Sequence, residues 1–164
     1  MVDVSEKPAT ARRAVAEGLL TLEQETISLI VDGGMTKGDV LTVAELAGVL
    51  GGKKTPDLIP LAHPIPLTDL KVEITPDRSA GGLRIRATAA TVGPTGVEME
   101  ALTAVSVAAL AAYDMVKSVD RGATIRDIRL LEKSGGKSGD WRREEGPQRP
   151  APPSPKPRRS AGRV

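Results

Sequence analysis

The sequence predicts an α+β fold, a two-layer sandwich in which helices pack on one face of an antiparallel sheet. Segments of helical periodicity and segments of period two are mixed along the chain, without the regular alternation that builds a parallel sheet. Two period-two segments are joined by a short turn, which indicates antiparallel pairing. The longest helical segment is rich in alanine, so its backbone can approach a sheet closely.

The first part of the chain supplies one strand and two helices. Residues 11–22 fit a helix by their alanine content and a strand by their alternation, and we interpret them as a strand. Residues 23–34 and 38–53 have apolar side chains at helical spacing, and both segments end in Gly-Gly, which is typical of a helix C-cap. The face of the second helix that we predict to be buried holds Val40, Val43, Ala44, Ala47 and Leu50.

The second part of the chain begins with a hairpin. Residues 69–74 (DLKVEI) and 82–89 (GLRIRATA) alternate apolar and charged side chains, and turn residues lie between them. One face of this hairpin is therefore expected to be solvated. Residues 98–120 form the longest predicted helix, and residues 125–134 return to the pattern of a strand.

The composition excludes several kinds of site. The 164 residues include no cysteine and one histidine, which excludes disulfides, thiolate zinc sites, a cysteine nucleophile and histidine-rich metal sites. Any metal would have to bind carboxylates, and we expect neither a metal site nor a cofactor. With one tryptophan, one tyrosine and no phenylalanine, the core must be aliphatic, and we expect a partner subunit to complete its burial.

Charge and proline content divide the chain in two. From Trp141 onward there are seven basic residues and two glutamates, and six prolines lie between Pro147 and Pro157. Such a segment buries too little apolar surface to offset its ordering entropy. We therefore predict one folded domain at residues 1–141 and a disordered, basic tail rich in proline and arginine at residues 142–164.

The N-terminal residues and the hydropathy pattern indicate a cytoplasmic protein with no membrane partner. MVDVSEKPATARR lacks the apolar core of a signal peptide. No run of the sequence approaches the roughly 18 apolar residues needed to span a bilayer.

The glycine-rich stretch KSGGKSGD at residues 133–140 looks like a phosphate loop. It fails the Walker A pattern, because Leu131 stands where that pattern needs glycine. Its lysines, serines and backbone N–H groups would still suit an anion. A solvated loop that ends a strand fits the same residues, and the sequence alone favours that interpretation slightly.

Charged residues lie at both ends of the longest predicted helix. Asp114 and Lys117 are three residues apart and share a face, which fits an exposed ion pair or, if the face lines a cleft, a proton donor and acceptor. Spacing does not choose between these hypotheses. Glu98 and Glu100 open the helix, where carboxylates complement the positive end of its dipole.

Lys37 and His63 are further candidates. Lys37 lies just before a predicted helix N-terminus, where a lysine and free N–H groups can meet an anion. His63 lies in LIPLAHPIPL between prolines at positions 60, 64 and 66, which fix backbone φ and remove N–H donors. A core or loop histidine satisfied by the backbone is one interpretation, and a rigidly presented ring for proton transfer near neutrality is the other.

Several of these segments together carry a resemblance to a known family. TKGDVLTVAELAG, IPLAHPIPL, TGVEMEALTAVSVAAL, YDMVK and LLEKSGGKSGD, in this order and spacing, closely resemble the cyclic pyranopterin monophosphate synthase family, the molybdenum cofactor biosynthesis accessory protein C. The resemblance runs from residue 1 to the aromatic residue after Asp140, and the tail lies outside it. It implies a ferredoxin-like sheet with helices on one face. It also implies a homohexamer, a trimer of dimers with active sites at subunit contacts.

The resemblance further implies a lyase of the phosphorus–oxygen type. The family converts 3′,8-cyclo-7,8-dihydro-GTP to cyclic pyranopterin monophosphate and releases pyrophosphate, without a redox step, in molybdenum cofactor biosynthesis. Residues 1–141 would then be a catalytic synthase domain with a small-molecule substrate and no nucleic-acid partner.

The family's functional positions can be carried over to this chain. The resemblance implies that Asp114 is the catalytic aspartate and that Lys117 is its acid/base partner. It also implies catalytic positions at His63, Lys37, Glu98 and Lys133, with Arg12 as a further addition. The substrate-contact positions are Leu61, Ala62, His63, Met99 and Glu100. Lys37, Lys117, Lys133 and Lys137 would supply positive charge for a triphosphate. The family commonly has cysteine at the position of Ala62, so a contact there must come from the backbone or be dispensable.

The basic tail supports an alternative, a non-catalytic polyanion- or nucleic-acid-binding module. The net charge of −3 over residues 1–140 and the near absence of aromatic stacking residues argue against it. A third hypothesis is a non-catalytic assembly protein, which predicts that Asp114 and Lys117 can be replaced together without consequence.

Overall fold

The computed structural model describes residue 1 and residues 3–144. The elements follow the order β1 (Thr10–Thr21), α1 (Gln24–Val31), α2 (Val40–Lys53), α3 (Thr55–Leu58), β2 (Leu67–Asp77), β3 (Gly82–Gly93), α4 (Glu98–Val116), β4 (Thr124–Ser134) and β5 (Trp141–Arg142). The strands form one antiparallel sheet in the order β2-β3-β1-β4-β5. Without β5, α1 and α3 this is the βαββαβ arrangement of a ferredoxin-like sandwich, and the predicted fold class is confirmed.

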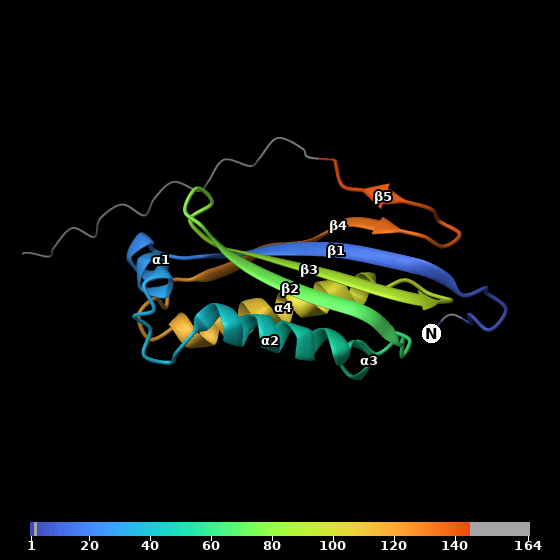
Figure 1. Ribbon diagram of the computed structural model, residues 1–164, viewed down its shortest axis with the longest axis horizontal. Helices are drawn as coiled ribbons and strands as arrows, with labels where there is room; N and C mark the ends of the chain where they lie inside the picture. Colours follow the sequence, from blue (N-terminus) through green and yellow to red (C-terminus); the bar gives the residue numbers. More distant parts are fainter. Residues whose placement is uncertain (2, 145–164) are drawn as a thin grey trace, which may run out of the picture.

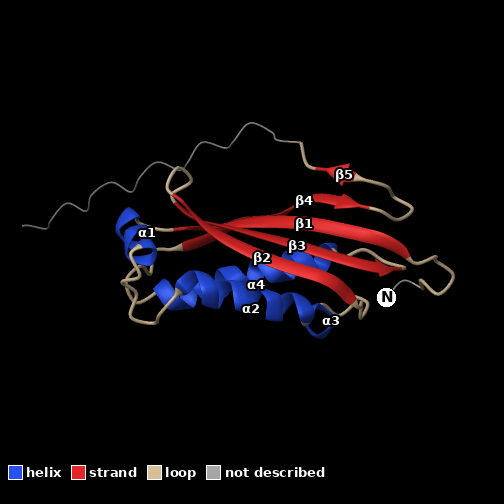
Figure 2. Ribbon diagram, in the orientation of Figure 1, coloured by secondary structure: helices blue, strands red, loops and turns tan. Residues whose placement is uncertain are grey.

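Two long helices form the second layer. α2 and α4 lie side by side along one face of the sheet, while α1 and α3 lie at opposite ends of the molecule (Figures 1 and 2). α4 is rich in buried alanines, and two of them, Ala104 and Ala108, lie against the glycines of α2. The buried alanines of α4 are Ala101, Ala104, Ala108, Ala109 and Ala112. The core between the layers is built from aliphatic side chains and methionine.

α2 corrects two sequence predictions. Its buried residues include Val40, Ala44, Gly48, Gly51 and Gly52, whereas Val43 and Leu50, which we predicted to be buried, are exposed. The glycines are buried because α4 crosses there: a Cβ at Gly51 would lie 2.6 Å from Cβ of Val107. Gly51-Gly52 therefore lies inside α2, which continues to Lys53, instead of ending the helix.

The other Gly-Gly pair does end its helix, as predicted. Gly33 has φ of 69°, which favours glycine. The Gly34 N–H donates to the Leu29 carbonyl at 2.8 Å, and the Gly33 N–H donates to the Ile30 carbonyl at 3.2 Å. This is the Schellman arrangement, and it turns the chain from α1 toward Lys37.

The expectation about membrane spans needs correction. Within the described part of the chain, α4 is long and apolar enough to cross a membrane by length and composition alone. However, 56% of the apolar stretch of this helix is buried inside the fold. The core helix of a soluble protein can be equally long and apolar. The helix therefore gives only weak support for a membrane span.

The strand structure continues past residue 141. Arg142 pairs with Glu132 in the β4–β5 ladder, and the side chain of Arg143 donates to the Leu130 carbonyl at 2.8 Å. The guanidinium of Arg143 also lies 5.5 Å from the ring centroid of Trp141. The remainder of the predicted tail, residues 145–164, lies outside the described residues.

Candidate functional site

The residues singled out in the sequence fall into two groups at opposite ends of α4. We call one group the aspartate end; it consists of Lys37, Asp114 and Lys117. We call the other group the histidine end; it consists of Leu61, Ala62, His63, Glu98, Met99, Glu100 and Lys133. Glu98 begins α4 and Asp114 lies in its last turn. At about 1.5 Å per residue, about 24 Å of helix separates these two residues.

Asp114 holds together the aspartate end. Its Oδ1 lies 2.6 Å from Nζ of Lys117, and its Oδ2 lies 2.9 Å from Nζ of Lys37. Lys37 also donates to the Asp114 backbone carbonyl at 2.8 Å. A carboxylate near the C-terminus of a helix is repelled by the negative end of the helix dipole. The two ammonium groups compensate this unfavourable position. The fold thus joins Lys37, from the connection before α2, to the YDMVK segment of α4.

These contacts shift the ionisation of both partners. Hydrogen bonds from Lys117 and then Lys37, together with their charges, lower the pKa of Asp114 to about 2. The Asp114 carboxylate in turn raises the pKa of Lys117 above its ordinary value. At neutral pH the free protein therefore holds an ionised aspartate and a protonated Lys117, with side chains more than half exposed.

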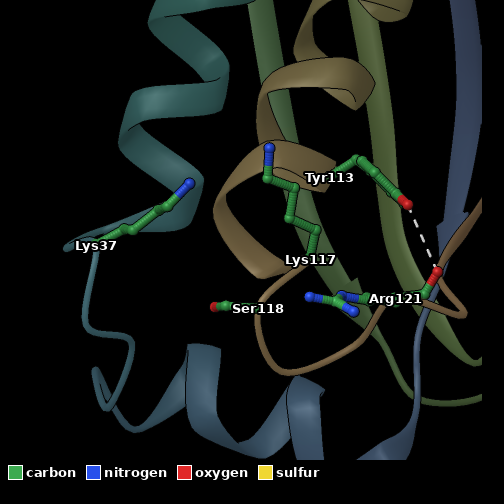
Figure 3. A pocket seen from close by; sticks show the side chains of 5 residues that line it. All are labelled: Lys37, Tyr113, Lys117, Ser118 and Arg121. Carbon is green, nitrogen blue, oxygen red and sulfur yellow. Dashed lines mark hydrogen bonds between the residues drawn. The ribbon is translucent and has the colours of Figure 1, made fainter.

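A pocket of about 320 Å³ opens beside this cluster and is lined by Lys37, Tyr113, Lys117, Ser118 and Arg121 (Figure 3). In the close-up, Lys37 reaches in from the segment before α2, and the other residues belong to the end of α4 and the turn after it. Sequence reasoning did not single out Ser118, which fell inside the helix predicted over residues 98–120, or Arg121, which directly follows it. Their one signal was position, directly after the YDMVK segment.

At the histidine end, Glu100 is the buried acid. Its side chain is on the first turn of α4, only 3% of the residue is exposed, and Oε2 has no hydrogen-bond partner among the described residues. Burial raises the pKa of Glu100, and the nearby charge of Glu98 acts in the same direction. Met99 between them is 40% exposed. A buried, unpaired carboxyl beside an exposed apolar side chain suits contact with a ligand.

The LIPLAHPIPL segment connects the end of α3 to β2 at the same end of the molecule. His63 is half-buried, Ala62 is half-buried, and Leu61 is 70% exposed. The Thr91 hydroxyl donates to the Pro66 carbonyl at 2.7 Å, and the Ala62 N–H donates to the Ile59 carbonyl at 3.0 Å. These bonds and the prolines fix the segment on both sides of His63.

The KSGGKSGD loop follows β4 at the histidine end and packs beside the start of β1. Lys133 pairs with Ala14 across β1, and its Nζ contacts the Ser138 hydroxyl. The Gly135 N–H donates to the Asp140 carboxylate at 3.1 Å, and Gly135, Gly136 and Gly139 all have positive φ. The loop is therefore an organised turn with its own hydrogen bonds. Its function as an anion-binding loop stays a prediction.

Arg12 fixes the backbone on which this end is built. Its side chain donates to the carbonyls of Gly93 at 2.9 Å and Pro94 at 3.0 Å, just before α4 begins. The guanidinium also packs against Gly136, where a Cβ would clash with it. Arg12 therefore joins the loop before α4 to the KSGGKSGD loop.

Among the residues that the structure describes, no group of three or more histidine, aspartate or glutamate side chains is arranged to hold a metal ion. A second pocket, of about 340 Å³, lies along β4 and β5 and includes Lys133, Asp140 and Trp141 in its lining. Its wall mixes both signs of charge, whereas the pocket at the aspartate end is lined by cations and hydroxyl groups.

Comparison with known proteins identifies close relatives. The MoaC family model matches residues 1–136. The chain is 57% identical over 141 residues to a cyclic pyranopterin monophosphate synthase of Brucella ovis, covering 86% of each chain. It is 56% identical over 145 residues to the same-named protein of Thermomicrobium roseum, covering 88% of this chain and 87% of the relative. For Cereibacter sphaeroides the identity is 59% over 139 residues, covering 85% of this chain and 87% of the relative.

Proposed function

The chain belongs to the MoaC family, and we propose that it is a cyclic pyranopterin monophosphate synthase of molybdenum cofactor biosynthesis. The names of its relatives support this activity. The structural observation that carries the proposal is the carboxylate of Asp114, held between Lys37 and Lys117 beside a cationic pocket. A cytoplasmic enzyme without a cofactor or a nucleic-acid partner is part of the same proposal.

The proposed substrate is 3′,8-cyclo-7,8-dihydro-GTP, and the products are cyclic pyranopterin monophosphate and pyrophosphate. The enzyme would therefore be a phosphorus–oxygen lyase. To form the cyclic phosphate, a sugar hydroxyl attacks the α-phosphorus while pyrophosphate leaves. Neutralisation of charge on the leaving oxygens dominates such a step. The cationic pocket at the aspartate end supplies that charge.

The rearrangement of the purine-derived ring needs repeated proton transfers, and the two ends offer different groups for them. Asp114 is an ionised acceptor whose proton donor partner, Lys117, is in direct contact. Glu100 is buried and its pKa is raised, so it is suited to enter as a neutral acid. His63, Glu98 and Lys133 would complete the histidine end.

One protomer cannot bring the two ends to one substrate, because about 24 Å of helix lies between them. We therefore place each complete site at a subunit contact, where the aspartate end of one subunit faces the histidine end of another. The homohexamer, a trimer of dimers, is the proposed assembly. Exposed apolar side chains on α2 and α4 support association. They include Val43, Leu46, Leu50 and Leu110.

Incubation of the purified full-length protein with the proposed substrate tests the activity. We expect release of pyrophosphate and formation of the pterin product. Joint replacement of Asp114 and Lys117 by alanine should abolish product formation, which separates an enzyme from a non-catalytic assembly protein. The matched control is joint replacement of Lys54 and Asp57, an exposed ion pair with the same three-residue spacing, which should leave the activity intact. Absence of product with the unmodified protein would refute the proposal.

The alternative function, polyanion binding through the basic tail, is not favoured. Most of that tail lies outside the described residues, and the relatives' names point to the synthase.

A further inference from the structure

Each of the five residues that line the pocket at the aspartate end has a hydrogen-bond donor in its side chain. Lys37, Lys117 and Arg121 are cationic, and Ser118 and Tyr113 carry hydroxyl groups. Asp114 is not among the residues that line the pocket, although its carboxylate contacts two of them, Lys37 and Lys117. Such a wall attracts an anion.

Arg121 differs from the other two cations of this pocket. Lys37 and Lys117 both donate to Asp114, whereas the Arg121 side chain has no ion pair with any described residue. In Figure 3 its guanidinium points away from the sheet, toward the side of the pocket that carries Ser118. Its planar set of N–H donors is therefore available, and this geometry matches pairs of phosphate oxygens.

The turn that carries Arg121 is fixed by the fold. The N–H groups of Val119 and Asp120 both donate to the Val116 carbonyl at 2.9 Å. The buried Asp120 carboxylate accepts the Glu23 N–H at 2.9 Å, which joins the turn to the start of α1. Tyr113 adds a long contact, 3.5 Å, from its hydroxyl to the Arg121 carbonyl. A backbone held at these points presents Arg121 before a ligand arrives.

The size of the pocket limits what it can hold. Its volume of about 320 Å³ is at the lower end of the roughly 300–1,000 Å³ of small-molecule sites. A diphosphate group is small enough for a pocket of this volume.

We propose that Arg121 and the Ser118 hydroxyl bind the terminal phosphate groups of the substrate, the part that leaves as pyrophosphate. This assignment rests on the proposed function. Lys37 and Lys117 then lie between Asp114 and the phosphates and contact both. Arg121 contacts the phosphates alone, so it is a binding residue for the leaving group and not a proton-transfer residue.

Binding of inorganic pyrophosphate to the full-length protein, followed by calorimetry, tests this assignment. Arg121→Gln should weaken binding by about tenfold or more, because a charge-assisted pair of hydrogen bonds is lost. The affinity of Arg121→Lys for pyrophosphate should lie between those of Arg121→Gln and the unmodified protein, because lysine keeps the charge and loses the planar geometry. Ser118→Ala should have a smaller effect. The matched control is Arg86→Gln, which removes an exposed arginine from β3 and should leave the affinity unchanged.

The outcomes separate this assignment from the activity itself. Suppose that the unmodified protein forms product and that Arg121→Gln binds pyrophosphate as tightly as the unmodified protein. The phosphate subsite is then wrong and the function stands. If the unmodified protein does not bind pyrophosphate at all, the subsite is also refuted. If pyrophosphate binds through Arg121 but no pterin product forms, the subsite stands and the proposed reaction fails.

Discussion

Lys37 donates to both the carboxylate and the backbone carbonyl of Asp114, at 2.9 and 2.8 Å. These residues lie 77 positions apart in the chain, and the contact joins the segment before α2 to the last turn of α4. It also leaves Asp114 with two cationic partners, since Lys117 contacts the other carboxylate oxygen at 2.6 Å. The predictions below follow from this arrangement and from the residues at the far end of α4.

Replacement of Asp114 by asparagine should lower kcat by about 10²–10⁴-fold, the usual contribution of a positioned acid/base group. Asparagine keeps the shape of the side chain, so the loss would report charge and not folding. Steady-state kinetics of product formation checks this. Asp57→Asn, the equivalent change in an exposed pair on α3, should retain full activity.

The same substitution should change how stability depends on pH. Because Asp114 has a folded-state pKa of about 2 against an ordinary value of 3.8, its ionised form stabilises the fold above pH about 3.8, and this contribution is lost as pH falls through about 2. The difference in Tm between the unmodified protein and Asp114→Asn should be largest near neutrality and vanish at the acid limit. A difference that grew on acidification would contradict the assigned contacts.

Glu100→Gln should show the opposite dependence. Burial raises the Glu100 pKa above its ordinary value of 4.5, so the ionised form is disfavoured in the folded protein. Below the ordinary value Glu100 is neutral in both the folded and the unfolded protein, so it does not lower the stability of the fold there. The fold loses stability as pH rises through the raised pKa, because the carboxyl must then ionise in a buried position. The glutamine variant should therefore have a higher Tm than the unmodified protein at pH 8 and the same Tm at pH 4. Glu25→Gln, at an exposed position in α1, should show no such gain.

Gly51→Ala should destabilise the protein by about 1–3 kcal/mol, as expected when a packed core is overfilled. The added Cβ would lie 2.6 Å from the branched side chain of Val107. The sign of the change in the free energy of unfolding is informative, because alanine normally stabilises a helix interior by about 1 kcal/mol relative to glycine. Chemical denaturation checks the value. Lys53→Ala, at an exposed position two residues along α2, is the control and should have little effect.

The sequence was sufficient for the fold class because local patterns reflect it directly. Alternating residues in the hairpin indicate which side of each strand is buried, and the apolar positions of α4 indicate the buried side of that helix. The buried face of α2 was predicted only in part: Val40 and Ala44 are buried as expected. The rest of that face is made of glycines, which carry no hydropathy signal, while the apolar Val43 and Leu50 are exposed.

The site was predictable residue by residue only through the family resemblance. No local pattern shows that Lys37 reaches Asp114, because that contact depends on how α2 packs beside α4. By contrast, the helix predicted over residues 98–120 did separate Glu98 from Asp114, and α4 places them near its two ends. Arg121 was missed because it follows the helix and shares no periodicity with it.

Mixed assemblies of two inactive variants test most directly whether each site combines the two ends from different subunits. Asp114→Asn damages one end and His63→Ala the other, and each homogeneous assembly should be nearly inactive. Hybrids can be purified through two different tags. If sites are shared, these hybrids should recover about a quarter of the unmodified activity, because about one subunit contact in four then combines an intact aspartate end with an intact histidine end. Hybrids of Asp114→Asn with Lys117→Ala, which damage the same end, should recover none. Absence of recovery in the first hybrid as well would contradict the shared site.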